Sequence, residues 1–295
     1  MRLHPECIPC MLKARVKEID RFVADRKKGL EIISSIMKEV LPYIVSDEIG
    51  PKVGTISFRL LRKLIGVDDP YFEYKKASND FALAIVNLIK DKLSELNGYE
   101  KFRTLAYLAI MGNSVDPGAA DYKFSIEEWR KYVTNVNIDL DDTLKLYKRL
   151  KSSSIGRIAY LCDNAGEIVF DKLLIEFLID NGVEVVAVVR GAPFQNDALM
   201  FDAEYIGLTK VTKVISTGSD SVGFIIDWLP EEVVNEVLSS DLIISKGLGN
   251  YETLNYYRDI GRIGKPIFYL LVAKCKPVAK SIGCKVGDYV AWLCE

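Results

Sequence analysis

The first half of the chain, up to about residue 152, has the hydrophobic pattern of helices. Apolar residues recur every three or four positions, separated by lysines and glutamates, in the segments 10–22, 30–44, 81–96 and 102–111. Turn-forming pairs such as Gly50-Pro51, Asp69-Pro70 and Asn97-Gly98 separate these segments. No segment before residue 152 predicts a strand, so we expect this region to be entirely helical.

The pattern changes at Lys151-Ser152-Ser153-Ser154. Beyond this point, short apolar runs rich in β-branched residues alternate with helical segments, and the runs cover 155–161, 183–189, 211–215, 242–245 and 266–272. Continuous apolar strands separated by helices indicate a parallel sheet that is covered on both faces. We therefore expect a helical N-terminal region in residues 1–152. Residues 153–295 are expected to form a Rossmann-like, three-layer α/β/α domain with a mostly parallel sheet.

Composition limits the kinds of partner that we expect. The chain has 295 residues, a formal net charge of -2 and a pI near 5.7, which argues against a nucleic-acid-binding surface. No apolar run approaches the roughly 18 residues of a membrane span, and the first residues lack the apolar core of a signal peptide. Six cysteines in a chain of this length do not indicate a disulfide framework. We expect a cytoplasmic protein without a membrane or nucleic-acid partner, and the sequence leaves the oligomeric state open.

Polar residues follow each predicted strand, where ligands bind in sheets of this kind. Acids and amides come after the early strands, whereas lysines and glycines come after the late ones. The sets are Asp163, Asn164 and Glu167; Arg190, Asn196 and Asp197; Thr217 to Asp220; Lys246 to Asn250; and Lys274 with Lys276. This distribution predicts an anion site that also contains a cation.

The chemistry of such a site follows from the donor types. Two carboxylates and an amide carbonyl are hard oxygen ligands suited to Mg²⁺, Mn²⁺ or a similar divalent ion. Lysines and the N–H groups of glycine-rich turns would neutralise phosphate oxygens. Together these groups would stabilise the charge of a phosphoryl transition state.

Each of these residues also has a purely structural interpretation. Asn164 and Glu167 have the spacing of a capping box, and Asn196-Asp197 could cap the following helix. Lys246 and Lys274 could be solvated surface residues. The functional interpretation therefore depends on all of them reaching one edge of one sheet.

With these motifs, the sequence resembles the metal-dependent damage-control phosphatases, also known as domain of unknown function 89. The resemblance covers most of the chain and depends on Asp163-Asn164-Ala165-Gly166-Glu167, Asn196-Asp197, Lys246-Gly247-Leu248-Gly249-Asn250-Tyr251 and Lys274-Cys275-Lys276-Pro277-Val278-Ala279. Gly112-Asn113-Ser114-Val115-Asp116 resembles a further motif of the family. Cys7-Ile8-Pro9-Cys10 resembles the N-terminal cysteine pair of its prokaryotic branch.

The resemblance implies phosphatase activity on small phosphorylated metabolites such as sugar phosphates, with manganese, cobalt, nickel or magnesium as cofactor. It implies that Asp163, Asn164 and Asp197 bind the metal, with Glu167 close by, either behind the metal ligands or as a proton carrier, so that Asp163, Glu167 and Asp197 are the catalytic candidates. The implied phosphate- and substrate-binding residues are Asn113, Asp116, Lys246, Gly247, Asn250 and Lys274. Leu248 stands where the eukaryotic branch usually has Asp, so substrate choice is not carried over from that branch.

Two weaker motifs have competing explanations. Asp139-Leu140-Asp141-Asp142-Thr143 matches the nucleophile signature of haloacid-dehalogenase-like phosphatases, but the half-polar segment before it does not predict the required buried strand. The N-terminal turn of a helix explains these acids better. His4, Cys7 and Cys10 are spaced like metal ligands, yet a structural zinc site usually has four. We therefore leave open whether Cys7 and Cys10 form a second metal site, a redox-sensitive pair or an inert pair.

Two functional alternatives remain at this stage. Gly247-Leu248-Gly249-Asn250 is a weak glycine turn that would also suit a Rossmann-like, S-adenosylmethionine-dependent methyltransferase or a nucleotide-binding module. However, such cofactors usually bind after the first strand, and no G-x-G-x-x-G, P-loop or G-x-S-x-G motif is present. For a phosphatase, the nucleophile is either a water molecule or Asp163 itself, which would form an aspartyl-phosphate.

Overall fold

The computed structural model describes residues 1–112, 133 and 135–295. The helices described in residues 1–112 are α1 (Cys7–Phe22), α2 (Arg26–Val45), α3 (Gly50–Ile65), α4 (Phe72–Glu95) and α5 (Gly98–Met111). The sequence pattern did not predict α3, because Gly50-Pro51 was interpreted only as a break. Proline lacks an N–H and fits the first turn of a helix, so this pair in fact begins α3. Asn113 and Asp116 lie outside the described residues.

The predicted α/β sheet is formed mainly by residues 153–295. Its strands are β1 (Leu140–Asp141), β2 (Arg157–Leu161), β3 (Glu184–Val189), β4 (Lys213–Ser216), β5 (Leu242–Lys246), β6 (Ile267–Val272) and β7 (Tyr289–Cys294). Their order is β1-β7-β6-β5-β2-β3-β4, and only the β6–β7 pair is antiparallel. The mostly parallel α/β fold is therefore confirmed, although β7 was not anticipated.

The expectation that no strand precedes residue 152 is wrong. Leu140 and Asp141 form β1, which pairs with β7 at one edge of the sheet. Helix α7 (Thr143–Lys151) follows directly, and the Asp141 carboxylate accepts a hydrogen bond from the Thr143 N–H at 3.0 Å. The acids of the 139–143 segment thus serve an edge strand and the start of a helix, and not the end of a buried strand.

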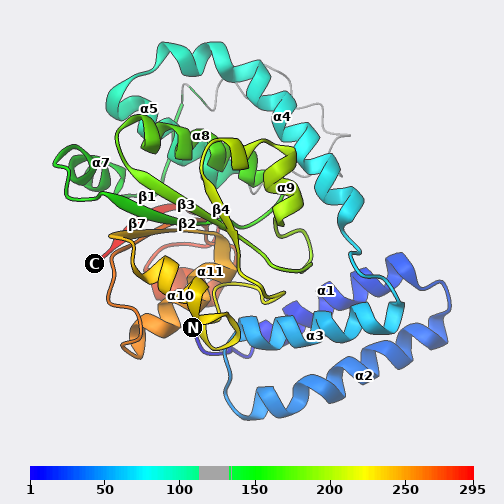
Figure 1. The fold of residues 1–295 in the computed structure, drawn as a ribbon. Coiled ribbons are helices and arrows are strands. Elements are labelled where there is room, and N and C mark those ends of the chain that lie inside the picture. The colour runs from blue at the N-terminus through cyan, green and yellow to red at the C-terminus, as the bar shows by residue number, and fades with distance from the viewer. Residues whose placement is uncertain (113–132, 134) are drawn as a thin grey trace.

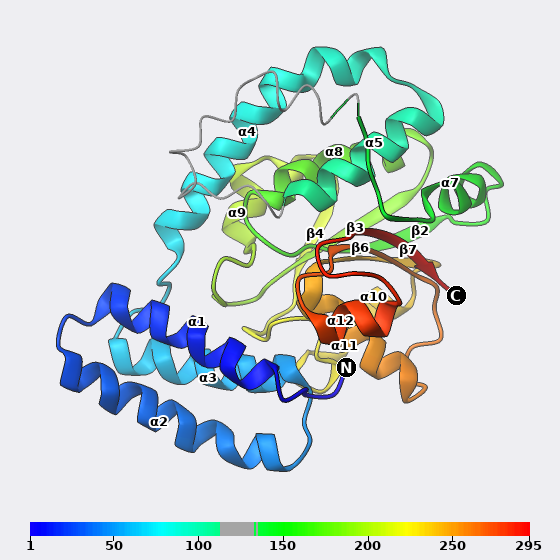
Figure 2. The ribbon, with the colours of Figure 1, turned by 180° about the vertical axis from the view of Figure 1, so that it is seen from behind.

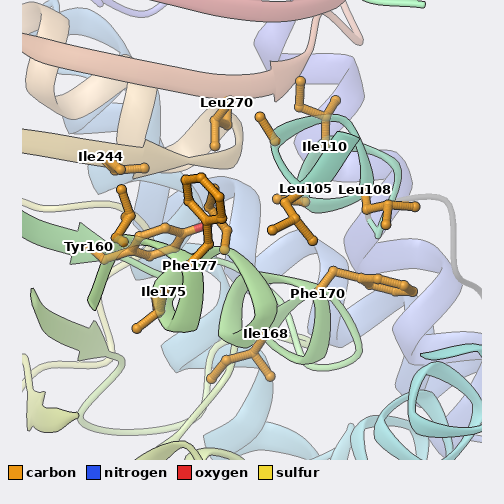
Figure 3. Packing of buried hydrophobic residues seen from close by; sticks show 14 of the residues in the cluster. Leu105, Leu108, Ile110, Tyr160, Ile168, Phe170, Ile175, Phe177, Ile244 and Leu270 are labelled. Atoms are coloured by element: carbon orange, nitrogen blue, oxygen red, sulfur yellow. The ribbon is translucent and has the colours of Figure 1, made fainter. Parts of the chain in front are cut away.

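Helices cover both faces of the sheet (Figure 1). The helices described after residue 152 are α8 (Glu167–Asp180), α9 (Met200–Tyr205), α10 (Glu231–Leu238), α11 (Gly247–Asp259) and α12 (Lys276–Ile282), with 3-10 turns η3 (Leu208–Lys210) and η4 (Ile226–Trp228). Residues of α4, α5, α7 and α8 form one core with the sheet, and residues of α10, α11 and α12 form a second core on the opposite face. Figure 3 shows Leu105 and Leu108 of α5 beside Phe170 and Phe177 of α8. None of the described helices combines the length and apolar composition needed to cross a bilayer.

Helices α1, α2 and α3 have a separate hydrophobic core beside the sheet (Figures 1 and 2). This core includes Phe194, which belongs to the loop between β3 and α9, and its ring lies 5.1 Å from that of Phe58. The loop after β3 is therefore packed against the helical region as well as against the sheet.

The strand order identifies where a ligand should bind. From β2 the chain continues outward through β3 and β4, whereas β5, β6 and β7 extend in the other direction. The order reverses between β2 and β5, and a crevice forms at the carboxyl ends of the strands flanking such a reversal. Asp163 follows β2 and Gly247 follows β5, so both residues lie at this point.

Candidate functional site

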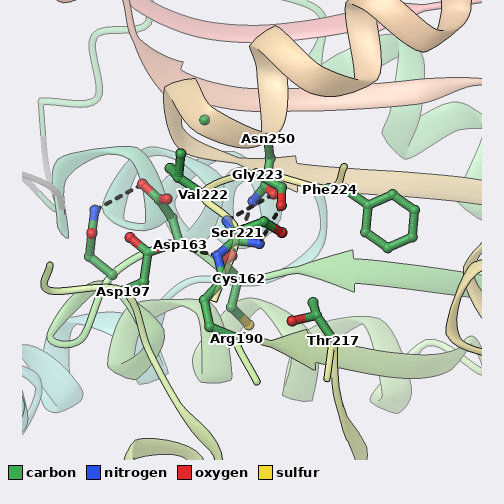
Figure 4. A network of polar contacts seen from close by, with 12 residues as sticks. Cys162, Asp163, Arg190, Asp197, Thr217, Ser221, Val222, Gly223, Phe224 and Asn250 are labelled. Atoms are coloured by element: carbon green, nitrogen blue, oxygen red, sulfur yellow. Dashed lines mark hydrogen bonds and ion pairs between the residues drawn. The ribbon is translucent and has the colours of Figure 1, made fainter. Parts of the chain in front are cut away.

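The loops after β2 and β3 are joined through their backbones. Asn164 and Asp197 form an antiparallel bridge. The Ala198 N–H donates to the Asp163 carbonyl at 2.8 Å, and the Ala165 N–H donates to the Asn196 carbonyl at 2.9 Å. Residues 34 positions apart in the chain are thus fixed side by side, and Figure 4 shows Asp163 and Asp197 together at this edge of the sheet.

Asp163 and Asp197 are both buried and electrostatically unfavourable as a pair. Their exposed fractions are 7% and 4%. Burial raises the pKa of Asp163 well above its usual range, and the carboxylates of Glu167 and Asp197 raise it further. Burial also raises the pKa of Asp197, although the Arg190 guanidinium opposes that effect. A cation between these carboxylates would remove the repulsion.

Arg190 connects the two halves of the site. Its Nε donates to Asp197 Oδ2 at 2.6 Å, one terminal nitrogen donates to the Gly223 carbonyl at 3.0 Å, and the other donates to Asn250 Oδ1 at 3.1 Å. The guanidinium is buried, and these bonds fix the orientation of the Asp197 carboxylate (Figure 4). Sequence reasoning noted Arg190 after its strand but gave it no role.

Asn164 links Asp163 to Glu167. Its amide nitrogen lies 2.8 Å from Asp163 Oδ2 and 2.6 Å from Glu167 Oε1. The capping alternative is wrong, because Gly166 occupies the N-cap of α8 and no side chain caps that end. Asp197 does not cap α9 either, since that helix begins at Met200 and the Leu199 N–H donates to Asp202.

Lys246 faces the protein interior and has two carboxylate partners. Its Nζ lies 3.0 Å from Glu167 Oε2 and 3.0 Å from Asp171 Oδ1, and the side chain is fully buried. Burial alone would lower the pKa of the Lys246 ammonium, but the two carboxylates outweigh burial and raise it. Burial raises the pKa of Asp171 to about 6, while Lys246 and the Tyr160 hydroxyl counteract this shift. Lys246 is therefore not a solvated surface lysine.

Gly247 allows β5 to approach the Asp163 carboxylate closely. Its φ is +74°, and a Cβ atom at this position would lie 1.9 Å from Asp163 Oδ2. Asn250, one turn further along α11, is buried and donates to the Cys162 carbonyl at 3.1 Å and the Lys246 carbonyl at 2.9 Å. In this structure, Asn250 therefore joins β2, β5 and Arg190.

The helical region also holds the loop after β2. The Gly166 N–H donates to Asn79 Oδ1 of α4 at 2.7 Å, and Asn79 Nδ2 donates to Asp202 Oδ1 at 2.7 Å. Asn79 is completely buried. Nothing in the sequence pattern distinguished Asn79, because it lies within an ordinary helical segment.

The remaining candidates are Lys274, Cys7 and Cys10. Lys274 is exposed and lies two residues beyond the end of β6. Cys7 and Cys10 occupy the first turn of α1, where Cys7 is half-buried and Cys10 is exposed, and both are free thiols. Burial raises the pKa of the Cys7 thiol. The proposed roles of Lys274, Cys7 and Cys10 stay predictions.

The charges of the site are unbalanced in a way that suits a divalent cation. Four buried carboxylates, those of Asp163, Glu167, Asp171 and Asp197, face two buried cations, Arg190 and Lys246. Within the described ranges, no group of three or more His, Cys, Asp or Glu side chains is arranged to hold a metal. A cation here would instead use the two aspartates and the Asn164 amide oxygen, a hard donor set of the kind that magnesium and manganese prefer. The residues present therefore fit such an ion.

A mostly parallel α/β sheet with buried carboxylates and a helix N-terminus at its topological switch point has the arrangement in which proteins of this fold class bind ligands. Comparison with known proteins narrows the class. A family model described as the damage-control phosphatase ARMT1-like domain matches residues 3–290. The chain belongs to this family.

Individual relatives match this chain over nearly its full length. The chain is 34% identical to a damage-control phosphatase of Archaeoglobus fulgidus, and the match covers 100% of both chains. It is 31% identical to damage-control phosphatase PH1575 of Pyrococcus horikoshii, over 98% of this chain and 97% of that protein. The crystal structure of PH1575, a protein of domain-of-unknown-function family 89, superimposes with a TM-score of 0.87 at 32% identity and covers 99% of each chain.

Proposed function

We propose that this protein is a divalent-metal-dependent phosphatase that hydrolyses phosphomonoesters of small metabolites such as sugar phosphates. The observation that carries the proposal is the excess of buried carboxylates over buried cations around Asp163 and Asp197. Family membership and the names of the relatives support the reaction type.

In this proposal Asp163, Asn164 and Asp197 hold the metal, which would be manganese, cobalt, nickel or magnesium. When bound, it supplies positive charge to the phosphoryl group and lowers the pKa of a water molecule. Arg190 fixes the orientation of Asp197 through its 2.6 Å bond.

The start of α11 would bind the phosphate. This helix begins at Gly247 directly after β5, so the N–H groups of its first turn have no partner within the helix. Such N–H groups and the positive end of the helix dipole favour a phosphate oxygen. Lys246 would add positive charge beneath the site while remaining paired with Glu167 and Asp171.

The geometry at Gly247 also bears on the alternative of a nucleotide or methyl-donor site. The space in front of this glycine contains the Asp163 carboxylate, which would repel the phosphates of a nucleotide unless a cation lay between them. The turn therefore favours a metal–phosphate site.

The test is phosphate release from a panel of sugar phosphates with each of the four metals, with and without a chelator. We expect activity that requires metal and disappears in Asp163→Asn. Asp180→Asn, which changes an exposed acid at the end of α8, is the matched control and should retain wild-type activity. Chelator-resistant turnover, or stabilisation by S-adenosylmethionine alone, would contradict the proposal.

A further inference from the structure

Gln195 occupies an unusual backbone conformation two residues before Asp197. The Asp197 N–H donates to the Phe194 carbonyl at 3.0 Å, which closes a turn with Gln195 and Asn196 at its centre. The φ of Gln195 is +42°, a conformation that glycine, asparagine and aspartate adopt far more readily than glutamine. A glutamine at this position needs a compensating contact from its side chain.

The side chain of Gln195 makes that contact with helix α1. Its Nε2 donates to Glu18 Oε1 at 2.8 Å, across 177 positions of sequence. Glu18 is 3% exposed, so this charge-assisted bond is shielded from water. The bond joins the helical region directly to the loop that carries Asp197.

Glu18 is itself held by two further groups. Arg15 approaches it through Nε at 2.8 Å and a terminal nitrogen at 3.0 Å, and the Tyr71 hydroxyl donates to Oε1 at 2.8 Å. Arg15 is 2% exposed, and its guanidinium also lies over the Phe58 ring. A carboxylate held by two other donor residues, Arg15 and Tyr71, is a rigid anchor for Gln195.

We propose that the contact between Glu18 and Gln195 positions Asp197 for metal binding, so that both are positioning residues of the site. This inference rests on the proposed function and extends it to α1. The helical region then acts as the support of a ligand-bearing loop. If the contact is lost, the Gln195 backbone can relax from its positive φ, and the turn that ends in Asp197 changes with it.

The first test removes the amide and keeps the length of the side chain. In Gln195→Met, we expect Mn²⁺ affinity measured by titration calorimetry to fall about tenfold. Hydrogen exchange of residues 194–198 in the metal-free protein should become faster. The matched control is Tyr257→Phe, which also removes one side-chain hydrogen bond to a carboxylate, that of Asp227 at 2.8 Å. It should change neither measurement.

The second test exchanges the residue types of Gln195 and Glu18. Gln195→Glu places two carboxylates against each other and should weaken Mn²⁺ binding more than Gln195→Met does. Adding Glu18→Gln removes this repulsion and leaves one carboxylate beside Arg15, so the double variant should regain part of the lost affinity. A merely destabilising substitution would not be rescued in this way.

The outcomes separate this inference from the function it rests on. Wild-type Mn²⁺ affinity in Gln195→Met, or no rescue in the double variant, would overturn the inference. If the wild-type protein bound no Mn²⁺ at all, the proposed function would fall. The exchange measurement would still decide the positioning role, because unchanged exchange at 194–198 would refute it.

Discussion

Replacing Gly247 with alanine should disable the site through a single added methyl group. The Cβ would lie 1.9 Å from Asp163 Oδ2, whereas ordinary contacts of this kind begin at 3.4 Å. The Asp163 carboxylate must therefore move by about 1.5 Å, the difference between these distances. Its neighbours limit this movement, because the Asp163 carbonyl is bonded to Ala198 and its carboxylate to Asn164.

The size of the effect follows from that displacement. A misplacement of about 1 Å in a reacting constellation can lower the rate about 100-fold. We therefore expect kcat/KM for phosphate release to fall at least about 100-fold in Gly247→Ala and Mn²⁺ affinity to fall with it. The alanine also adopts a φ of +74°, which destabilises the fold by about 1 kcal/mol.

Gly261 provides a control that isolates the contact from the backbone strain. Its φ is +73°, nearly the same as that of Gly247, and no atom lies within 4 Å of a Cβ built there. Gly261→Ala should therefore lose a similar amount of stability in a urea titration and keep full activity. Equal activities of the two variants would refute the proposed closeness of Gly247 and Asp163.

Three further predictions concern buried carboxylates and one buried hydrogen bond. In Asp163→Asn, relief of carboxylate repulsion should stabilise the metal-free protein in urea unfolding while eliminating turnover; destabilisation would contradict the raised pKa of Asp163. Asn79→Asp sets a carboxylate against Asp202 and should destabilise by about 2 kcal/mol, and a second change, Asp202→Asn, should restore stability. Burial raises the pKa of Glu252 from 4.5 to about 7, so the folded state keeps a proton that the unfolded chain releases. Stability should fall between these pH values, and Glu252→Gln should melt above the wild type at pH 8 but not at pH 4.

Periodicity predicted the parts of the fold that repeat regularly. The five continuous apolar runs after residue 152 correspond to β2 to β6. Of these strands, β2, β3, β5 and β6 are almost entirely buried, and strands buried on both faces admit few polar residues. The two strands that the pattern did not predict are β1 and β7. β1 has only two residues, one of them Asp141, and β7 lies between β1 and β6 and runs antiparallel to β6. β1 is too short to give a recognisable strand pattern, and β7 does not belong to the series of parallel strands that the apolar runs indicated.

The site was predictable in outline because strand ends converge. The sequence indicated that Asp163, Asp197 and Gly247 would lie beyond strands of one sheet, and the structure places all three at its switch point. The sequence could not indicate that Lys246 faces Glu167 and Asp171, because that direction depends on the packing of α8 against β5. It also could not indicate Glu18 or Asn79, since each acts across a long separation in sequence from within a helix.

The central claim is that Asp163 and Asp197 share one divalent cation. Anomalous diffraction from a crystal soaked in Mn²⁺ tests it most directly. We expect a single strong peak within about 2.5 Å of oxygen atoms from Asp163, Asn164 and Asp197. A map with no peak there, or with its peak beside Cys7 and Cys10, would contradict the claim.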